Sequence, residues 1–227
     1  MRIGGAALAT GLVMMAGLAF AQTTPAAESQ SAYVTRCKRE TVAKWPSARA
    51  QAESMCQANW EMIVATGPLA DALLSLAPPT GTAYEPTSAR ARAVGVRWMA
   101  RASRGHAATG RVGDVSVMLS PPPAQRVELG WFQAGAPIPY MFEEALRVRG
   151  VRPAMIGCMA FGPAESTSVY RVAAPGKAPF VLTVARREAA LGSQTSTLSI
   201  AADFSGQPVT LATLRRDGSE FAASCPS

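Results

Sequence analysis

An apolar segment at the start of the chain constrains everything that follows. Arg2 supplies a positive charge, an apolar run extends from Ile3 to Phe20, and the run ends in the small-residue pattern Ala19-Phe20-Ala21. This order is typical of a secretory signal peptide that is cleaved after its last small residue. We therefore expect residues 1–21 to be removed after Ala21, and the mature protein to be periplasmic or secreted, where cysteines oxidise.

Four cysteines then define a covalent framework. Four cysteines allow three pairings. Cys37 and Cys56 flank Pro46 at similar sequence distances, so in a helical hairpin that turns at the proline both would lie ~14 Å from the turn. We predict a Cys37–Cys56 disulfide on this geometry, and a Cys158–Cys225 disulfide by elimination.

Composition changes divide the mature chain into four parts. Residues 22–30 are polar and are expected to form a flexible tail, and residues 31–77 carry helical periodicity. Residues 78–93 are rich in Pro, Thr and Arg and are expected to be a linker. Residues 94–227 alternate apolar and polar positions between turn signals, which predicts a sheet domain.

Within the helical part, spacings of three and four predict a helix that ends before Pro46 and a second helix after it. Gly67-Pro68 is expected to end the second helix, and a short third helix is expected to carry Leu69, Leu73 and Leu76.

The remaining pattern predicts seven strands and one helix. Short turns between the later strands favour antiparallel pairing, and the helix is expected to pack on the sheet. The predicted fold class is α+β: an N-terminal disulfide-bridged helical hairpin followed by a mostly antiparallel β-sheet domain with one packed helix. The strands are expected at 94–99, 112–119, 127–131, 154–161, 167–173, 179–187 and 195–204, and the helix at 139–149.

Groups for hydrolytic catalysis are sparse. The single histidine, His106, would have to serve any Ser-His-Asp device, with Asp114 as a possible partner, yet no G-x-S-x-G turn is present. Glu143-Glu144 is the only adjacent acidic pair, and neighbours on a helix point apart by ~100°. We therefore expect no enzyme. A glycosidase-type pair would have to combine distant carboxylates such as Glu128 with Glu165 or Asp203.

The sequence predicts no metal or other cofactor. The cysteines lack C-x-x-C spacing and there is no second histidine. Met155, Cys158 and Met159 are close enough for a soft-metal cluster. In a regular strand, however, Met155 and Met159 would share one face while Cys158 points to the other.

An arginine-rich stretch is the first candidate binding surface. The chain carries a net charge of +7, and no acidic residue lies between Glu85 and Asp114. Arg97, Arg101 and Arg104 are the residues in this stretch that we expect to attract an anionic partner. The alternative is compositional, because the chain uses arginine almost throughout, with only three lysines.

Aromatic residues in a Gly/Pro-rich stretch are the second candidate. Trp131, Phe132 and Tyr140 could form a platform for a carbohydrate or peptide. Alternatively, they anchor the predicted helix to the sheet.

These patterns predict a non-catalytic binding or scaffold protein of the bacterial cell envelope. Its partner is expected to be an anionic envelope component or an envelope protein, not nucleic acid, and no transmembrane segment is expected in the mature chain. The alternative is an inhibitor or modulator of an envelope hydrolase such as a lysozyme or protease, and a hydrolase using His106 ranks last. Over about 45 residues the cysteine spacing resembles small secreted lysozyme-inhibitor-like helical domains. Ala58-Asn59-Trp60-Glu61 replaces the Asp-x-x-Leu-Asn expected there, so we assign no membership.

Overall fold

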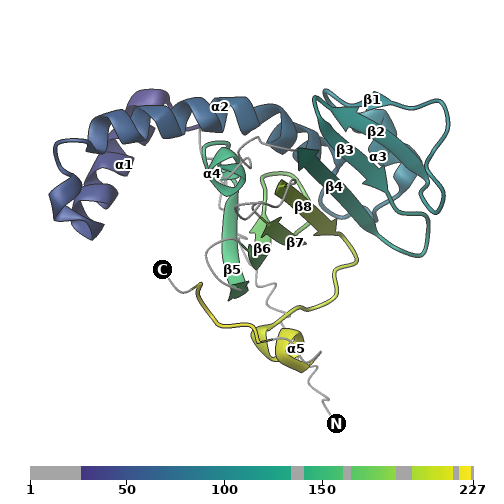
Figure 1. The fold of residues 1–227 in the computed structure, drawn as a ribbon. Coiled ribbons are helices and arrows are strands. Elements are labelled where there is room, and N and C mark those ends of the chain that lie inside the picture. Colours follow the sequence, from purple (N-terminus) through teal and green to yellow (C-terminus); the bar gives the residue numbers. More distant parts are fainter. Residues whose placement is uncertain (1–26, 134–140, 161–164, 188–195, 217–219, 226–227) are drawn as a thin grey trace, which may run out of the picture.

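A helical hairpin extends from one side of an eight-stranded antiparallel sheet (Figure 1). The computed structural model describes residues 27–133, 141–160, 165–187, 196–216 and 220–225. Its helices are α1 (Gln30–Lys44), the 3-10 turn η1 (Pro46–Ala48), α2 (Ala52–Leu76), α3 (Pro86–Arg92), α4 (Phe142–Arg147) and α5 (Leu211–Arg216). Its strands are β1 (Arg97–Trp98), β2 (Ala108–Val112), β3 (Val115–Leu119), β4 (Arg126–Gln133), β5 (Arg152–Ala160), β6 (Glu165–Ala173), β7 (Phe180–Arg187) and β8 (Ser196–Asp203).

The sheet consists of two meanders of four strands each. Its strand order is β1-β2-β3-β4-β8-β7-β6-β5, and every neighbouring pair is antiparallel. The seam between the meanders is the β4–β8 pair, in which Leu129 lies opposite Ile200 and Trp131 opposite Leu198. The predicted α+β class is therefore confirmed.

One face of the sheet holds the core. Alternate residues of the central strands are fully buried, as period-2 patterning requires. They form one buried cluster with apolar residues of α2 and α4, which contact each other. Members from the helices include Ile63, Leu73, Phe142 and Leu146, and members from the strands include Leu129, Leu182, Val184 and Ile200.

The helical hairpin turns at Pro46, as predicted. Pro46 begins η1, and Cys37 and Cys56 form a disulfide with a Cα–Cα separation of 5.9 Å. Further along the hairpin, the ring of Tyr33 packs against that of Trp60 with centroids 5.5 Å apart. The predicted hairpin and its bridge are confirmed.

Gly67-Pro68 does not end the second helix, so the predicted break there is wrong. α2 runs unbroken through Pro68 to Leu76. Pro68 lies on the exposed side, whereas Leu69, Leu73 and Leu76 are buried in the core. Burial of these leucines outweighs the loss of one helical hydrogen bond, since fully burying a leucine stabilises by about 1.5–3 kcal/mol. None of the described helices, α2 included, is long and apolar enough to cross a membrane.

The predicted single strand over 112–119 is also wrong, because it is divided by a tight hairpin. Val112 pairs with Val115, so Gly113-Asp114 forms a two-residue turn between β2 and β3. Gly113 has φ +55°, a left-handed conformation that glycine adopts without strain.

The predicted facing of Met155, Cys158 and Met159 is corrected by a β-bulge. The register of β5 against β6 shifts between Met155 and Gly157. The extra residue reverses the alternation, so Met155 and Cys158 point to the same face and Met159 to the other. The Cys158–Cys225 disulfide is present, with a Cα–Cα separation of 5.1 Å.

The C-terminal segment is bound to the edge strand β5 by backbone as well as by this disulfide. The amide of Cys158 donates to the carbonyl of Ala222, and the amide of Ala222 donates back to Cys158, both at 2.8 Å. A Cβ at Gly157 would come within 3.1–3.3 Å of Leu211, Leu214 and Phe221, which shows how closely this segment covers the strand.

Candidate functional site

The arginine-rich stretch divides into residues with structural roles and residues that face solvent. Arg92, on α3, donates to the carbonyl of Leu76 at the end of α2, and Lys177 donates to the carbonyl of Ala77. Cations at a helix C-terminus satisfy carbonyls that have no helical partner. Burial, and then the charge of Arg92, lower the pKa of Lys177. The guanidinium of Arg90 instead stacks over the ring of Trp98, 5.7 Å from its centroid.

Arg97 and Arg111 lie directly opposite each other on the paired strands β1 and β2. Residues opposite each other in a sheet project from the same face with Cβ atoms about 4.5–5.5 Å apart. Both side chains are exposed. Two like charges therefore meet across the strand pair at the edge of the sheet.

Arg101 and Arg104 lie in the loop that joins these two strands, and both are exposed. The loop is held at two points by Thr109, which is buried. The carbonyl of Thr109 accepts from the amide of Met99 at 2.9 Å, and its hydroxyl accepts from the amide of Ser103 at 2.9 Å. The two arginines therefore belong to a fixed loop beside Arg97.

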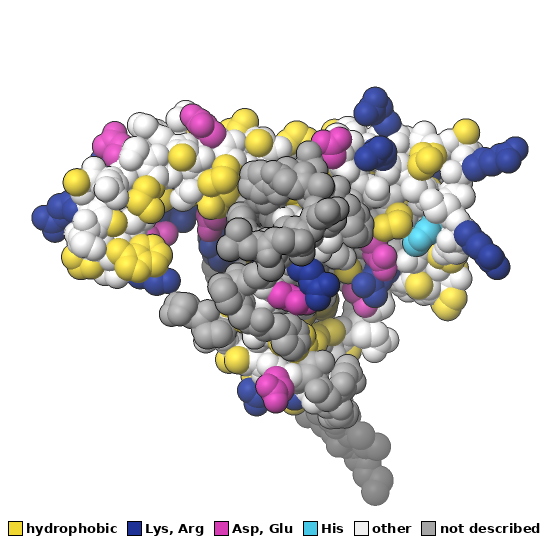
Figure 2. All heavy atoms as spheres, in the orientation of Figure 1, with side chains coloured by type: hydrophobic (Ala, Val, Ile, Leu, Met, Phe, Trp, Pro, Cys, Tyr) yellow, Lys and Arg dark blue, Asp and Glu magenta, His cyan; other side chains and the backbone are white. Residues whose placement is uncertain are grey.

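We call Arg97, Arg101, Arg104 and Arg111 the arginine edge. Figure 2 shows dark blue side chains extending from the end of the molecule where Figure 1 places β1 and β2. Within the described ranges, none of the four guanidinium groups forms an ion pair. Arg111 reaches only the backbone carbonyl of Asp114, at 3.4 Å. The arginine edge is thus a cluster of four cations without a carboxylate partner in that part of the chain.

His106 and Asp114 do not form a catalytic pair. His106 precedes β2 and Asp114 follows it, so the full length of the strand, about 3.3 Å per residue, separates them. The Nδ1 atom of His106 is buried and has no hydrogen-bond partner among the described residues. The other carboxylates considered above each have a partner of their own. Glu128 forms an ion pair with Arg126 and Glu165 with Arg187, and Asp203 accepts a hydrogen bond from the amide of Ser205.

The adjacent carboxylates of α4 point to different partners. Glu143 forms an ion pair with Arg186 of β7 and accepts a hydrogen bond from the hydroxyl of Tyr170 at 3.1 Å. Burial, and then the charge of Glu143, raise the pKa of Tyr170 to about 12. Glu144 instead pairs with Arg36 of α1 at 3.2 Å and with Arg147. These contacts attach α4 to the sheet and to α1. No motif in the sequence predicts them.

The structure places only one of the candidate aromatic residues. The side chain of Trp131 is buried in the core, with 6% of its surface exposed, which fits an anchoring role. The side chain of Phe132 and the whole of Tyr140 lie outside the described residues, so the proposed aromatic platform stays a prediction.

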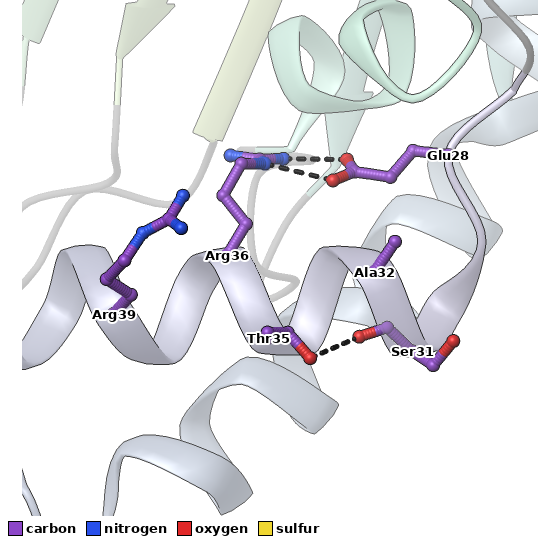
Figure 3. Close-up of a pocket in the computed structure, with 6 residues that line it drawn as sticks. All are labelled: Glu28, Ser31, Ala32, Thr35, Arg36 and Arg39. Carbon is purple, nitrogen blue, oxygen red and sulfur yellow. Dashed lines mark hydrogen bonds and ion pairs between the residues drawn. The ribbon is translucent and has the colours of Figure 1, made fainter.

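A shallow cavity of about 490 Å³ beside α1 is lined by Glu28, Ser31, Ala32, Thr35, Arg36 and Arg39 (Figure 3). Its central arginine is already engaged. Arg36 binds both carboxylate oxygens of Glu28, at 3.0 and 2.9 Å, as well as Glu144. The hydrogen bonds to Glu28 are the main reason that the pKa of Arg36 lies above its ordinary value. This cluster joins the segment before α1 to α4. Because Glu28 and Glu144 neutralise Arg36, this arginine has little charge left with which to bind a ligand.

No group of three or more His, Cys, Asp and Glu residues in the described part of the chain could hold a metal ion. No protein family model matches this chain, and neither curated proteins nor solved structures show a match. The arginine edge is therefore interpreted from its own geometry.

Proposed function

We propose that this is a non-catalytic binding protein of the bacterial cell envelope that holds an anionic partner on the arginine edge. The observation that supports it is the direct opposition of Arg97 and Arg111 with no carboxylate partner in the described ranges. Like charges directly opposite each other across a strand pair destabilise it. An anionic ligand between them would remove that repulsion.

The chemistry of the arginine edge fits carboxylate, phosphate or sulfate groups. A guanidinium presents a planar fork of donors that binds such groups through paired hydrogen bonds. An alternative role for these charges is to keep the edge strand from pairing with other chains, but Arg97 on the edge strand alone would serve that purpose. The additional arginines in the anchored loop extend the charge beyond the strand, which suits a repeating or extended anion.

The location of the protein is part of the same proposal. Two disulfides and no free cysteine are typical of proteins outside the cytosol. The apolar N-terminal segment would direct export, and its cleavage after Ala21 would leave Gln22 as the first residue of the mature chain.

The test is retention on columns of sulfated dextran and of polyglutamate as salt is raised. We expect the triple variant R97S/R101S/R104S to melt within about 2 °C of the wild type, because exposed side chains contribute little to stability. Its affinity should fall roughly tenfold, since each exposed ion pair contributes up to about 1 kcal/mol. The salt dependence of retention should also become shallower.

The matched control removes three exposed arginines from the other meander, in the variant R152S/R171S/R187S. It has the same net charge as the test variant, so nonspecific attraction falls equally in both. The control should elute much later than the test variant, close to the wild type. Equal elution of the two variants would reduce the arginine edge to compositional charge and overturn the proposal.

A further inference from the structure

The turn of the helical hairpin presents a tryptophan to solvent. Trp45 follows the last residue of α1, and 51% of its surface is exposed. Its neighbours in the turn, Pro46 and Ala50, are exposed and apolar as well. A helical turn needs no aromatic residue, and the short residues of η1 already reverse the chain. The exposed indole therefore has no structural explanation within the hairpin.

The main chain at Trp45 is held by hydrogen bonds. The amide of Trp45 donates to the carbonyl of Thr41 at 2.7 Å, and the carbonyl of Trp45 accepts from the amide of Ala48 at 3.0 Å. About two helical turns before Trp45, the Cys37–Cys56 disulfide joins the two helices. The backbone that carries Trp45 is thus held in place, so little ordering of the main chain is required when the indole meets a partner.

The turn carries two cations, one of which contacts the indole. The ammonium of Lys44 lies over the ring of Trp45, 4.6 Å from its centroid, and Arg49, which directly follows η1, is exposed. The nearest acidic residues are already paired: Glu40 with Arg36 at 3.4 Å, and Glu53 with Lys38 at 2.6 Å. Lys44 and Arg49 form no ion pair within the described ranges. We call Lys44, Trp45 and Arg49 the hairpin tip.

The hairpin tip and the arginine edge lie at opposite ends of the molecule (Figure 1). At the hairpin end, Figure 2 shows hydrophobic side chains next to lysine and arginine side chains. The two surfaces therefore face different surroundings and can be tested separately.

We propose that the hairpin tip docks on the surface of a lipid bilayer that contains anionic headgroups. Tryptophan is favoured at the boundary between headgroups and acyl chains, because its ring is apolar and its N–H needs a polar partner. Lysine and arginine beside it are attracted by the negative surface potential of anionic lipids. The charge of the tip thus complements the headgroups while the indole enters the interface. The chain would bind the surface without spanning the membrane.

The first experiment measures contact of Trp45 with lipid. Full-length mature protein is mixed with vesicles of phosphatidylcholine and phosphatidylglycerol, in which the acyl chains are brominated to quench nearby tryptophans. We expect quenching with the wild type and much less with W45F, although W45F should still sediment with the vesicles. The other three tryptophans then serve as an internal reference, because they are half-buried or buried. Equal quenching of wild type and W45F would overturn the proposal.

The second experiment measures the electrostatic contribution by co-sedimentation. Each cation near an anionic surface is worth about fivefold in binding, so K44S/R49S should bind on the order of 20-fold more weakly. The matched control is R152S/R187S, which removes the same charge from exposed positions of the sheet. Vesicles of phosphatidylcholine alone should bind neither variant strongly.

The outcome is separable from that of the proposed function. If R97S/R101S/R104S abolishes vesicle binding and K44S/R49S does not, the arginine edge binds the lipid and the hairpin tip does not. If K44S/R49S weakens vesicle binding but retains near wild-type elution from the polyanion columns, the hairpin tip is a lipid site separate from the arginine edge. No binding of the wild type to anionic vesicles would overturn the docking of the hairpin tip and leave the arginine edge unaffected.

Discussion

The ion pair between Glu143 and Arg186 should contribute strongly to the attachment of α4 to the sheet, in addition to the burial of Phe142 and Leu146. The side chains of Glu143 and Arg186 are only 13% and 12% exposed. Removing one partner of a buried pair leaves the other charge less compensated and costs about 3–5 kcal/mol. Because both groups keep some contact with solvent, we take the lower end, about 3 kcal/mol, for E143Q. The melting temperature of a chain of this size should then fall by about 6–12 °C.

The assay is urea unfolding followed by circular dichroism at neutral pH, with thermal melts in parallel. The matched control is E165Q, since Glu165 also pairs with an arginine of β7, but at 37% and 64% exposed side chains. An exposed pair contributes about 0–1 kcal/mol, so the control should melt within about 3 °C of the wild type.

A double variant separates charge from packing. In E143L/R186L both charges are removed together, and apolar replacement of a buried pair is often neutral or stabilising. We therefore expect E143L/R186L to recover most of the stability lost in E143Q. An E143Q variant as stable as E165Q, or a double variant no more stable than E143Q, would show that the pair is not effectively buried and would refute the reasoning.

Two further predictions concern alkaline stability and the arginine edge. The folded state raises the pKa of Tyr170 from 10.0 to about 12, so the neutral hydroxyl stabilises the fold below pH 10 and this contribution is lost as the pH rises toward 12. Urea midpoints measured below and above pH 10 should therefore drop less for Y170F than for the wild type. Identical drops would contradict the assignment. A Cβ at Gly110 would lie 2.7 Å from Val96 and 2.8 Å from Trp98, so G110A should displace β1 and destabilise the fold by about 1–3 kcal/mol. Retention on sulfated dextran should weaken as well. Unchanged melting and retention would show that β1 does not order the arginine edge.

Much of the fold is predictable from local pattern. The apolar alternation that ends in Trp131, and the turn residues between the later strands, locate β4 to β8 closely. Local pattern fails where burial from distant elements decides the outcome. Pro68 is a helix breaker in isolation, yet α2 continues because its last turns pack in the core. The bulge between Met155 and Gly157 has no signature in the sequence, so the facing of β5 could not be predicted.

The candidate sites differ in the same way. The arginine-rich stretch is evident from its charge. Which of its arginines are structural and which face solvent is not, because the structural role of Arg92 depends on its contact with the end of α2. The opposition of Arg97 and Arg111 follows from register, which required the hairpin at Gly113 to be recognised. Glu143 contacts Tyr170 and Arg186 across 27 and 43 residues of sequence, distances over which a single sequence carries no pairing signal.

The seam between the two meanders determines the order in which this protein can fold. Within each meander, consecutive strands pair over short loops. β4 instead pairs with β8, so residues as far apart in the sequence as Arg126 and Asp203 lie opposite each other, and β4 stays unpaired on this side until β8 is available. Long-range pairing is slow, because loop closure costs entropy before any contact compensates. If the chain crosses a membrane from its N-terminus, β4 emerges with one edge unpaired until the last strand arrives. Exposed strand edges are sites of aggregation. We therefore expect the interval between the emergence of β4 and β8 to be the vulnerable stage in the biogenesis of this protein.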